Sequence, residues 1–362
     1  MAFAKRLVWS IVSVVLFSIL IRHVFKLLWL FNVLNNQHSH MPGPCRTVKG
    51  IETGSEDIEL LSDGFAFIST GLTWPDFPLD DRPVGIYGFD LNQPNEDPIW
   101  LPMKGNFNQE NIVSHHGLSS WQDKASGEVT LFLISHRKDR DAVELFRFDK
   151  SSKTLHHRRT IDSPYFVSLN DLVATGSDSF YATNDGCLRW PSTRERLFMV
   201  EFLFFWRCGS VVYYDGNSAR VQKDNYLVAN GIKLSSNGSI LYVAHYGAKT
   251  IEVFQRNQDN SITEIRKIDL HMCPDNINVH KETGDILAVG ANGPLDFSVH
   301  PPSAPTSVLR IQATNGDKID ELLSDDGTQL SFGSVAERYG NLLLIGTVNN
   351  KAMLCELRSI AD

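Results

Sequence analysis

Six short polar pairs recur along the chain, and their side chains are of types that bind metal ions or move protons. They are Glu56–Asp57, His116–Gly117, Asn170–Asp171, Asn230–Gly231, Asp275–Asn276 and Gly333–Ser334. Successive pairs start 45 to 60 residues apart, and together they offer carboxylates, carboxamides and one imidazole but no thiolate. Such hard oxygen donors suit Ca²⁺, which takes about 6–8 oxygen ligands, better than Zn²⁺ or copper.

The pair Glu56–Asp57, taken alone, is more typical of a surface turn or a cap than of a metal site. Six pairs with complementary donors in the same register reverse that preference. Successive side chains of an extended chain point to opposite sides. Glu56 could therefore bind one cation, while Asp57 and Asp171 bind a second, more deeply buried one. Carboxylates held so close together would otherwise be expensive to bury.

The segments that follow each pair indicate the elements that must hold these side chains. After residue 45 the chain shows almost no helical periodicity, but it has short apolar alternations separated by Gly, Asn, Asp and Ser. Stretches such as "SDGFAFIS", "SNGSILYVA" and "ETGDILAVG" are typical of a turn followed by a strand. Six such repeats predict an all-β fold, a six-bladed β-propeller with four-stranded blades. The first strand of each blade would line the central channel, so the polar pairs should converge there.

The N-terminal segment differs from the rest of the chain. Lys5 and Arg6 precede the run Leu7–Ile21, in which serines are the only polar residues. Because no Ala-x-Ala-like cleavage site follows, we expect a retained signal anchor with a cytosolic N-terminus and a lumenal or extracellular body. The alternatives are a cleaved signal peptide, a tilted or interfacial helix, and a buried helix of the fold. The expected division is an anchor and linker over residues 1–39 and a propeller over residues 40–362.

Charge and surface motifs narrow the partners of the predicted propeller. The net charge is −8, from 34 basic and 42 acidic residues among 362, which argues against nucleic acid as a partner. The sequence "NGS" at Asn237 is an acceptor for N-glycosylation in an expected hairpin turn, or a chance match. The anchor and the sequon together predict the secretory pathway.

Five cysteines occur, at positions 45, 187, 208, 273 and 355. In an oxidising compartment, a bridge between Cys45 and Cys355 would join the two ends of the domain. Cys187 could pair with Cys208 and leave Cys273 free. The connectivity is not decided by the sequence.

Long motifs spread over all six repeats closely resemble the paraoxonase/arylesterase family. They are "CRTVKGIETGSEDIELL", "NDLVATGSDSFYATND", "ANGIKLSSNGSILYVA", "DNINVHKETGDILAVG" and "LLLIGTVNNKAMLCEL". The resemblance runs from about Cys45 to Leu357. It implies a six-bladed propeller with two calcium ions in its tunnel, and an N-terminal hydrophobic segment that is often retained. It also implies lactonase activity, wider esterase activity and sometimes organophosphatase activity, so residues 40–362 would form a hydrolase domain.

The resemblance assigns ligands to both calcium ions. An exposed catalytic calcium would be held by Glu56, Asn170, Asn230, Asp275 and Asn276. A buried structural calcium would be held by Asp57, Asp171 and a backbone carbonyl near Leu118. The resemblance also pairs Cys45 with Cys355 in a disulfide.

Two histidines match the residues proposed to move protons in this family. His116, in "SHHG", matches the general base, because Gly117 sets the register and excludes His115. His136, in "LISHRKD", matches the second histidine of a dyad, and Asp185, in "ATND", matches an acid near that site. The implied mechanism is hydrolysis of a lactone or aryl ester, with Ca²⁺ polarising the carbonyl and the dyad activating water. The sequence contains no Gly-x-Ser-x-Gly elbow that would indicate a nucleophilic serine.

Two departures from the family pattern bear on this expectation. Ala291 and Asn292 stand where mammalian members have a Cys-His pair, which puts organophosphatase activity in doubt more than lactonase activity. The segment Gly186–Gly209 diverges and is rich in apolar residues. It could form a lid, a membrane-facing patch or a partner surface, or it could simply pack under the propeller.

A non-catalytic function is the main alternative. An anchored propeller could serve as a chaperone or assembly factor for membrane proteins and use the region Leu197–Trp206. The retained anchor and Asn292 favour this alternative, while the complete ligand set and both histidines favour the enzyme. A sugar-lactone hydrolase of another calcium propeller family is disfavoured by the length of the matched motifs. The particular lactone or ester and the oligomeric state are not determined by the sequence.

Overall fold

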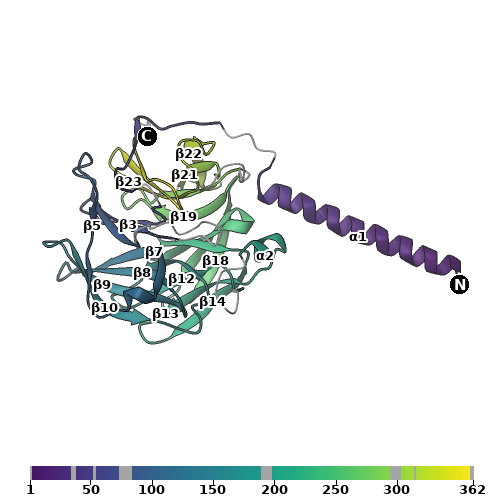
Figure 1. Cartoon of the computed structure of the whole chain (residues 1–362), viewed down its shortest axis with the longest axis horizontal. Helices are drawn as coiled ribbons and strands as arrows, with labels where there is room; N and C mark the ends of the chain where they lie inside the picture. The colour runs from purple at the N-terminus through teal and green to yellow at the C-terminus, as the bar shows by residue number, and fades with distance from the viewer. Residues whose placement is uncertain are drawn as a thin grey trace.

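Six β-sheets surround a central axis in the computed structural model, and a long helix, α1 (Ala2–Leu30), projects from this body (Figure 1). The structure describes residues 2–33, 38–51, 54–72, 84–188, 198–293, 303–313 and 315–358. The prediction of an all-β, six-bladed propeller preceded by an N-terminal apolar helix is confirmed.

Each blade is a sheet whose inner strand begins one of the six repeats. The first blade contains β2 (Ile58–Leu60), β3 (Phe65–Thr70), β4 (Gly85–Asp90) and β5 (Ile99–Trp100). The second contains β7 (Ile112–Gln122), β8 (Val129–Arg137), β9 (Asp141–Asp149) and β10 (Thr154–Ile161), with the short β6 (Met103–Lys104) parallel to β10. The third contains β11 (Leu169–Ala174), β12 (Phe180–Asn184), β13 (Gly209–Tyr214) and β14 (Ala219–Tyr226).

The other three blades repeat this order. The fourth contains β15 (Ala229–Leu234), β16 (Ile240–His245), β17 (Thr250–Arg256) and β18 (Ile262–Asp269). The fifth contains β19 (Cys273–Val279), β20 (Ile286–Ala291), β21 (Thr306–Gln312) and β22 (Lys318–Asp325). The sixth contains β23 (Gly333–Tyr339), β24 (Leu342–Thr347), β25 (Met353–Glu356) and, as its outer strand, β1 (Cys45–Thr47). The fourth strands, which the sequence pattern did not place, are β5, β10, β14, β18, β22 and β1.

The two ends of the propeller domain close the ring in the sixth blade. β1 pairs antiparallel with β25, and Cys45 lies directly opposite Cys355 in that pairing. The two cysteines form the disulfide that the family resemblance implied, across a sequence separation of 310 residues. Ring closure therefore combines a β-ladder with a covalent bond between strands from opposite ends of the domain.

Apolar side chains fill the spaces between neighbouring blades. Between the second and third blades, for example, Phe132 of β8, Leu172 of β11 and Phe180 of β12 are fully buried in one cluster. Burial of large apolar side chains is the main favourable term of folding. The apolar clusters between blades hold the inner strands next to one another around the channel. These strands are β2, β7, β11, β15, β19 and β23.

Two further helical segments, η1 (Gln109–Asn111) and η2 (Tyr246–Ala248), are short 3₁₀ turns. A short helix, α2 (Phe198–Leu203), lies beside the C-terminal end of α1, as Figure 1 shows. The ring centroids of Phe31 and Phe202 lie 5.4 Å apart there. Leu30, at the end of α1, is buried against Leu227 and Val228 of the propeller. The end of the helix is therefore part of the folded body.

Candidate active site

The inner strands are irregular at their polar pairs. In β7 the pairing with β8 shifts between His115 and Leu118, and in β11 the pairing with β12 shifts between Leu169 and Leu172. The same irregularity occurs at the pairs of β15, β19 and β23. A β-bulge interrupts the regular alternation and re-aims side chains, and bulges are common next to active sites. The bulges allow side chains of neighbouring pairs to contact each other around the channel.

Two pairs carry glycine in second position because the inner strands approach each other closely. A Cβ atom added at Gly117 would lie 2.6 Å from the Cα of Asp171. A Cβ atom added at Gly231 would lie 2.6 Å from the Cα of Asn276. Any larger residue would push apart the strands that carry the predicted ligands.

The five residues predicted to hold the catalytic calcium lie together at the N-terminal ends of the inner strands, which we call the near end of the channel. Asn276 Nδ2 donates to Glu56 Oε1 at 2.8 Å, and the Asn230 side chain hydrogen-bonds the Asp275 carboxyl group. The Nδ2 of Asn170 is also engaged, with a carboxylate at 3.4 Å.

The carboxamide oxygens at this end differ from the carboxamide nitrogens in their hydrogen bonding. The Oδ1 atoms of Asn170, Asn230 and Asn276 are buried and have no hydrogen-bond partner within the described part of the chain. An unsatisfied buried polar atom costs about 1–3 kcal/mol. A bound cation with oxygen ligands would remove that cost at all three positions. The chain's own donors therefore fit a hard cation such as Ca²⁺.

The carboxyl groups of the ring favour a cation as well. Burial raises the pKa of Asp275 well above its usual range, and the nearby Glu56 raises it further. Burial raises the pKa of Asp57 to about 7, an effect that Lys233 partly offsets. The pKa of Asp171 is likewise raised by burial and by Asp57. Buried like charges disfavour ionisation, and an added positive charge would restore it.

The predicted structural set, Asp57, Asp171 and Leu118, is also brought together. Asp57 Oδ2 accepts the N–H of Leu118 at 2.7 Å, and Asp171 Oδ2 accepts the N–H of Ile232 at 2.8 Å. The other oxygen of each carboxylate accepts the N–H of the following residue. The bond to Leu118 joins the first blade to the second, and the bond to Ile232 joins the third blade to the fourth. Leu118 enters this network through its N–H, and the role of a nearby carbonyl toward a cation stays a prediction.

The two predicted histidines are in direct contact. His116 Nδ1 lies 2.9 Å from His136 Nε2, and His116 Nε2 lies 3.5 Å from Glu56 Oε1. On the far side of the dyad, His136 Nδ1 lies 3.0 Å from Asp141 Oδ1. His115, which the register excluded, contacts Ser135 Oγ instead, and burial lowers its pKa to about 4.

Sequence reasoning missed Asp141. It is the residue of β9 directly opposite His136 of β8. The available signal was the short polar turn "RKDR" between two strand-like runs, because a tight hairpin puts the residues that flank its loop side by side.

Asp185, predicted as an acid near the dyad, lies beside one of the predicted metal ligands. Its Oδ1 accepts the Ser168 hydroxyl at 2.5 Å, and its Oδ2 accepts Asn170 Nδ2 at 3.4 Å. Holding the amide nitrogen of Asn170 leaves the amide oxygen for other contacts. The geometry therefore connects Asp185 to the orientation of Asn170.

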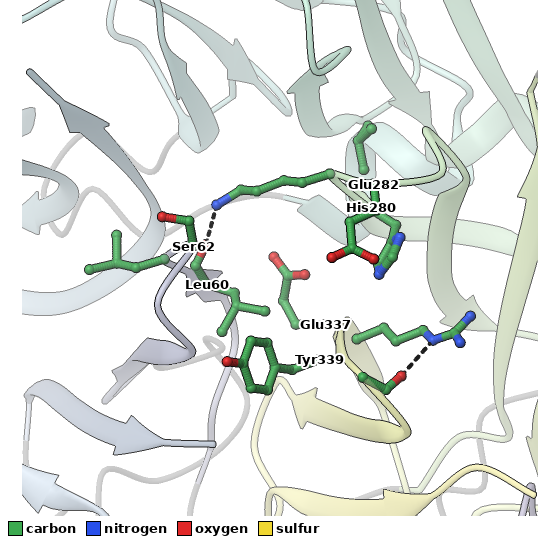
Figure 2. A pocket seen from close by; sticks show the side chains of 11 residues that line it. Leu60, Ser62, His280, Glu282, Glu337 and Tyr339 are labelled. Atoms are coloured by element: carbon green, nitrogen blue, oxygen red, sulfur yellow. Dashed lines mark hydrogen bonds between the residues drawn. The ribbon is translucent and has the colours of Figure 1, made fainter. Parts of the chain in front are cut away.

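The far end of the channel lies at the C-terminal ends of the inner strands, and its buried charged residues include lysines. Lys233 Nζ lies 2.9 Å from Glu59 Oε2, and both side chains are buried. Lys281 Nζ donates to the carbonyl oxygen of Leu60 at 2.7 Å, beside a cavity of about 440 Å³ (Figure 2). Glu337 points toward this cavity in Figure 2, and burial raises its pKa to about 8.

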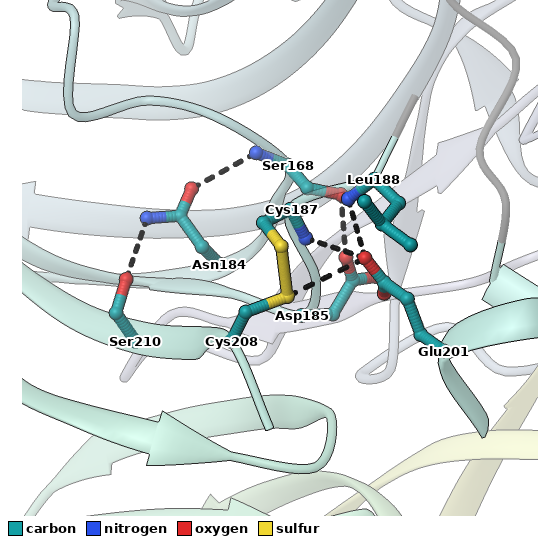
Figure 3. Close-up of a disulfide and its surroundings, with 8 residues drawn as sticks. All are labelled: Ser168, Asn184, Asp185, Cys187, Leu188, Glu201, Cys208 and Ser210. Carbon is teal, nitrogen blue, oxygen red and sulfur yellow. Dashed lines mark hydrogen bonds between the residues drawn. A yellow bond between two sulfur atoms is a disulfide. The ribbon is translucent and has the colours of Figure 1, made fainter. Parts of the chain in front are cut away.

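A disulfide between Cys187 and Cys208 joins the two ends of the segment that diverges from the family pattern (Figure 3). Cys273 is a buried free thiol. The Glu201 carboxylate of α2 accepts the N–H of Cys187 at 2.8 Å. Phe204 and Trp206, just after α2, are 71% and 54% exposed, so part of the segment forms an apolar surface. Residues 189–197, including the start of the region Leu197–Trp206, lie outside the described residues.

The end of α1 docks at the rim of the site through polar contacts. The buried Lys249 Nζ donates to the carbonyl oxygen of Trp29 at 2.5 Å. Asn32 Nδ2 donates to Asn292 Oδ1 at 3.0 Å, and Asn292 is one of the two residues that depart from the family pattern. Among the described residues, one helix (Lys5–Leu30) is long and apolar enough to cross a membrane, a property that anchors share with signal sequences.

Comparison with known proteins identifies the family. A family model described as Arylesterase matches residues 38–357. The chain belongs to the arylesterase family. It is similar to the mouse protein "Serum paraoxonase/lactonase 3", with 34% identity over 322 residues that cover 87% of this chain and 89% of the relative. It is 35% identical to the human "Serum paraoxonase/arylesterase 1" over 325 residues, which cover 86% and 88%. The predicted enzyme class, an ester-hydrolysing enzyme, is confirmed by this membership.

Solved structures support the fold alone. A luciferin-regenerating enzyme aligns with a TM-score of 0.54 at 11% identity, covering 86% of this chain and 94% of that one. A calcium-binding protein, regucalcin, from Agrobacterium tumefaciens aligns with a TM-score of 0.51 at 10% identity, covering 88% and 96%. These alignments agree with the fold described above.

Proposed function

We propose that this protein is a calcium-dependent hydrolase of lactones and aryl esters, in which His116 is the general base and His136 its partner. The observation that supports this most is the 2.9 Å contact between the two imidazoles, beside buried carboxamide oxygens without hydrogen-bond partners among the described residues. A family relationship alone would not specify which residues act.

The near end of the channel supplies the ligands for one cation, namely Glu56, Asn170, Asn230, Asp275 and Asn276. Asp57 and Asp171 would hold a second, structural cation. When bound, Ca²⁺ would polarise the substrate carbonyl and stabilise the negative charge that develops on its oxygen. Asp185 would keep the Asn170 amide in the orientation that presents Oδ1.

His116 and His136 would handle the proton. His116 Nε2 takes a proton from water, and the water oxygen bonds to the carbonyl carbon of the substrate. The acyl carbon–oxygen bond then breaks, and the proton passes to the departing alkoxide. The contact with His136 lets the positive charge on His116 be shared across the two rings. An ordinary histidine pKa of about 6.5 suits this function near neutral pH.

We also propose that α1 anchors the protein in a membrane of the secretory pathway. Apart from its serines, its side chains from Leu7 to Ile21 are exposed and apolar, while its C-terminal end docks on the propeller. Asn237 is exposed in the turn after β15, at the opposite end of that strand from Asn230. A glycan there would stand away from the docked anchor.

The test uses the full-length protein in detergent and a panel of aliphatic lactones and aryl esters. We expect hydrolysis that chelation abolishes and added Ca²⁺ restores. His116→Gln should lower kcat by about 10²–10⁴-fold. His156→Gln, on the outer strand of the same blade, is the matched control and should retain activity.

Unchanged turnover of every substrate by His116→Gln would remove His116 from the mechanism. If a folded, calcium-bound protein hydrolyses nothing, the enzyme proposal fails. The non-catalytic assembly factor for membrane proteins would then be the better explanation of the anchor and of the exposed Phe204 and Trp206.

A further inference from the structure

Asp141 lies at the buried end of the two histidines. Its side chain is fully enclosed, with the whole residue 1% exposed, and it starts β9 directly opposite His136. Its Oδ1 atom is 3.0 Å from His136 Nδ1, and its Oδ2 atom accepts the N–H of Leu169 at 2.9 Å. The carboxylate thus accepts from the backbone of the next blade and lies within hydrogen-bond distance of an imidazole nitrogen of its own blade.

These contacts favour one direction for the hydrogen bonds that run from Asp141 through His136 to His116. An ionised carboxylate only accepts hydrogen bonds, so His136 Nδ1 must carry the hydrogen that points at Asp141. A neutral imidazole has one N–H, so His136 Nε2 is then an acceptor. The atom 2.9 Å away, His116 Nδ1, must therefore donate to it. His116 Nε2 is consequently the acceptor nitrogen. It lies 3.5 Å from Glu56 Oε1, which is longer than an ordinary N–H···O hydrogen bond, so this contact does not require a hydrogen on Nε2.

We propose that Asp141 is a positioning residue that sets both histidines in the Nδ1–H tautomer, so that His116 Nε2 is the basic atom of the site. The inference rests on the proposed function and adds a third member to its dyad. When His116 takes a proton from water, its Nδ1 hydrogen can move to His136 Nε2. The imidazolium formed on His136 then lies against the Asp141 carboxylate, which stabilises the positive charge. No atom of Asp141 needs to touch the substrate.

A purely structural role for Asp141 must be separated from this one, because its bond to Leu169 also joins the second blade to the third. Asp141→Asn makes the distinction. An amide has one acceptor oxygen and one donor nitrogen, so it cannot accept from both Leu169 and His136. If the oxygen stays with the Leu169 N–H, the amide nitrogen faces His136 and donates to Nδ1. His136 would then carry its hydrogen on Nε2, and the direction of the dyad would be reversed.

The first readout is the tautomer itself. Full-length protein labelled with ¹⁵N-histidine is studied by NMR in detergent at about pH 8.5, about two units above the ordinary histidine pKa. We expect Nδ1–H for His116 and His136 in the unchanged protein and Nε2–H for His136 in Asp141→Asn. Asp139→Asn, at the exposed tip of the same hairpin, is the matched control and should keep the Nδ1–H pattern.

The second readout is kinetic. Asp141→Asn should lower kcat by about 10²–10⁴-fold, as expected for loss of an oriented base, with KM changed less than about twofold. An Nε2–H tautomer of His136 in the unchanged protein would overturn the proposal without any variant, even if Asp141→Asn does not fold. An unaltered kcat in a folded Asp141→Asn protein would also overturn it. If no substrate is hydrolysed but the tautomers follow the expected pattern, the orientation by Asp141 stands and the proposed function fails.

Discussion

The two ends of the central channel are built from the same six inner strands, yet their buried polar and charged side chains have different partners. At the near end, beside the histidine dyad, carboxamide oxygens of three asparagines have no hydrogen-bond partner among the described residues. At the far end, Glu59 is paired with Lys233, and the ammonium group of Lys281 is bound to a backbone carbonyl. The near end offers its oxygens to the proposed cation from outside, whereas the far end contains lysines of the chain itself.

This difference separates function from support. Lys233 is already ion-paired with Glu59, which belongs to another blade, so the far end is suited to holding blades together. An exchangeable cation can keep a position open for a substrate oxygen. Lys233 and Asn230 lie three residues apart on β15, so one strand serves both ends.

Replacing Lys233 at the far end should have the largest effect on stability. Lys233→Met should lower the free energy of unfolding by about 3–5 kcal/mol, because Glu59 would remain buried without its partner. Urea unfolding with a chelator present measures this loss apart from any metal. The double variant Lys233→Met/Glu59→Gln should recover most of the stability. A single variant as stable as the unchanged protein would show that the far end does not depend on its lysine.

Changing a ligand at the near end should affect activity and cation binding more than the fold. We expect Asp275→Asn to reduce kcat/KM by about 10²–10³-fold, the effect of losing electrostatic stabilisation of the oxyanion. Calcium affinity, measured by isothermal titration calorimetry, should fall at least about tenfold. Asp269→Asn, on the exposed end of β18, is the control. Unaltered calcium affinity in Asp275→Asn would place the cation elsewhere.

The pH dependence of stability tests whether Glu337 is buried in its neutral form at the far end. Burial raises the pKa of Glu337 to about 8 from its ordinary value of 4.5, against the opposing effect of Lys233. Between about pH 4.5 and pH 8 the folded protein holds a proton that the unfolded chain has released, so stability from this group falls as pH rises. As the pH rises from about 5 to about 8.5, the free energy of unfolding of Glu337→Gln should therefore fall by about 1–3 kcal/mol less than that of the unchanged protein.

Urea midpoints at several pH values, with a chelator present, measure this difference. Glu282→Gln, which lines the same cavity, is the control. Parallel curves for Glu337→Gln and the unchanged protein would contradict a buried, neutral Glu337.

Much of the near end was predictable because its residues recur with the repeat. The inner-strand pairs and the ring they form follow from strand and turn signals at regular spacing. The contact between His116 and His136 came from the family resemblance, and the structure brings the two rings together. The far end was not predicted, because Lys233 and Glu59 are 174 residues apart and neither belongs to a polar pair.

The sequence by itself determined the number of blades, the chemical types of the donors and the register of the pairs, because these depend on periodicity along the chain. Only the tertiary structure decided that Asp141 faces His136, that Lys233 reaches Glu59 and that Asn32 at the end of α1 touches Asn292. Each of these contacts joins segments whose separation is set by hairpin register, by ring closure or by docking of the helix. Side-chain type carries no information about such distances until the blades have packed.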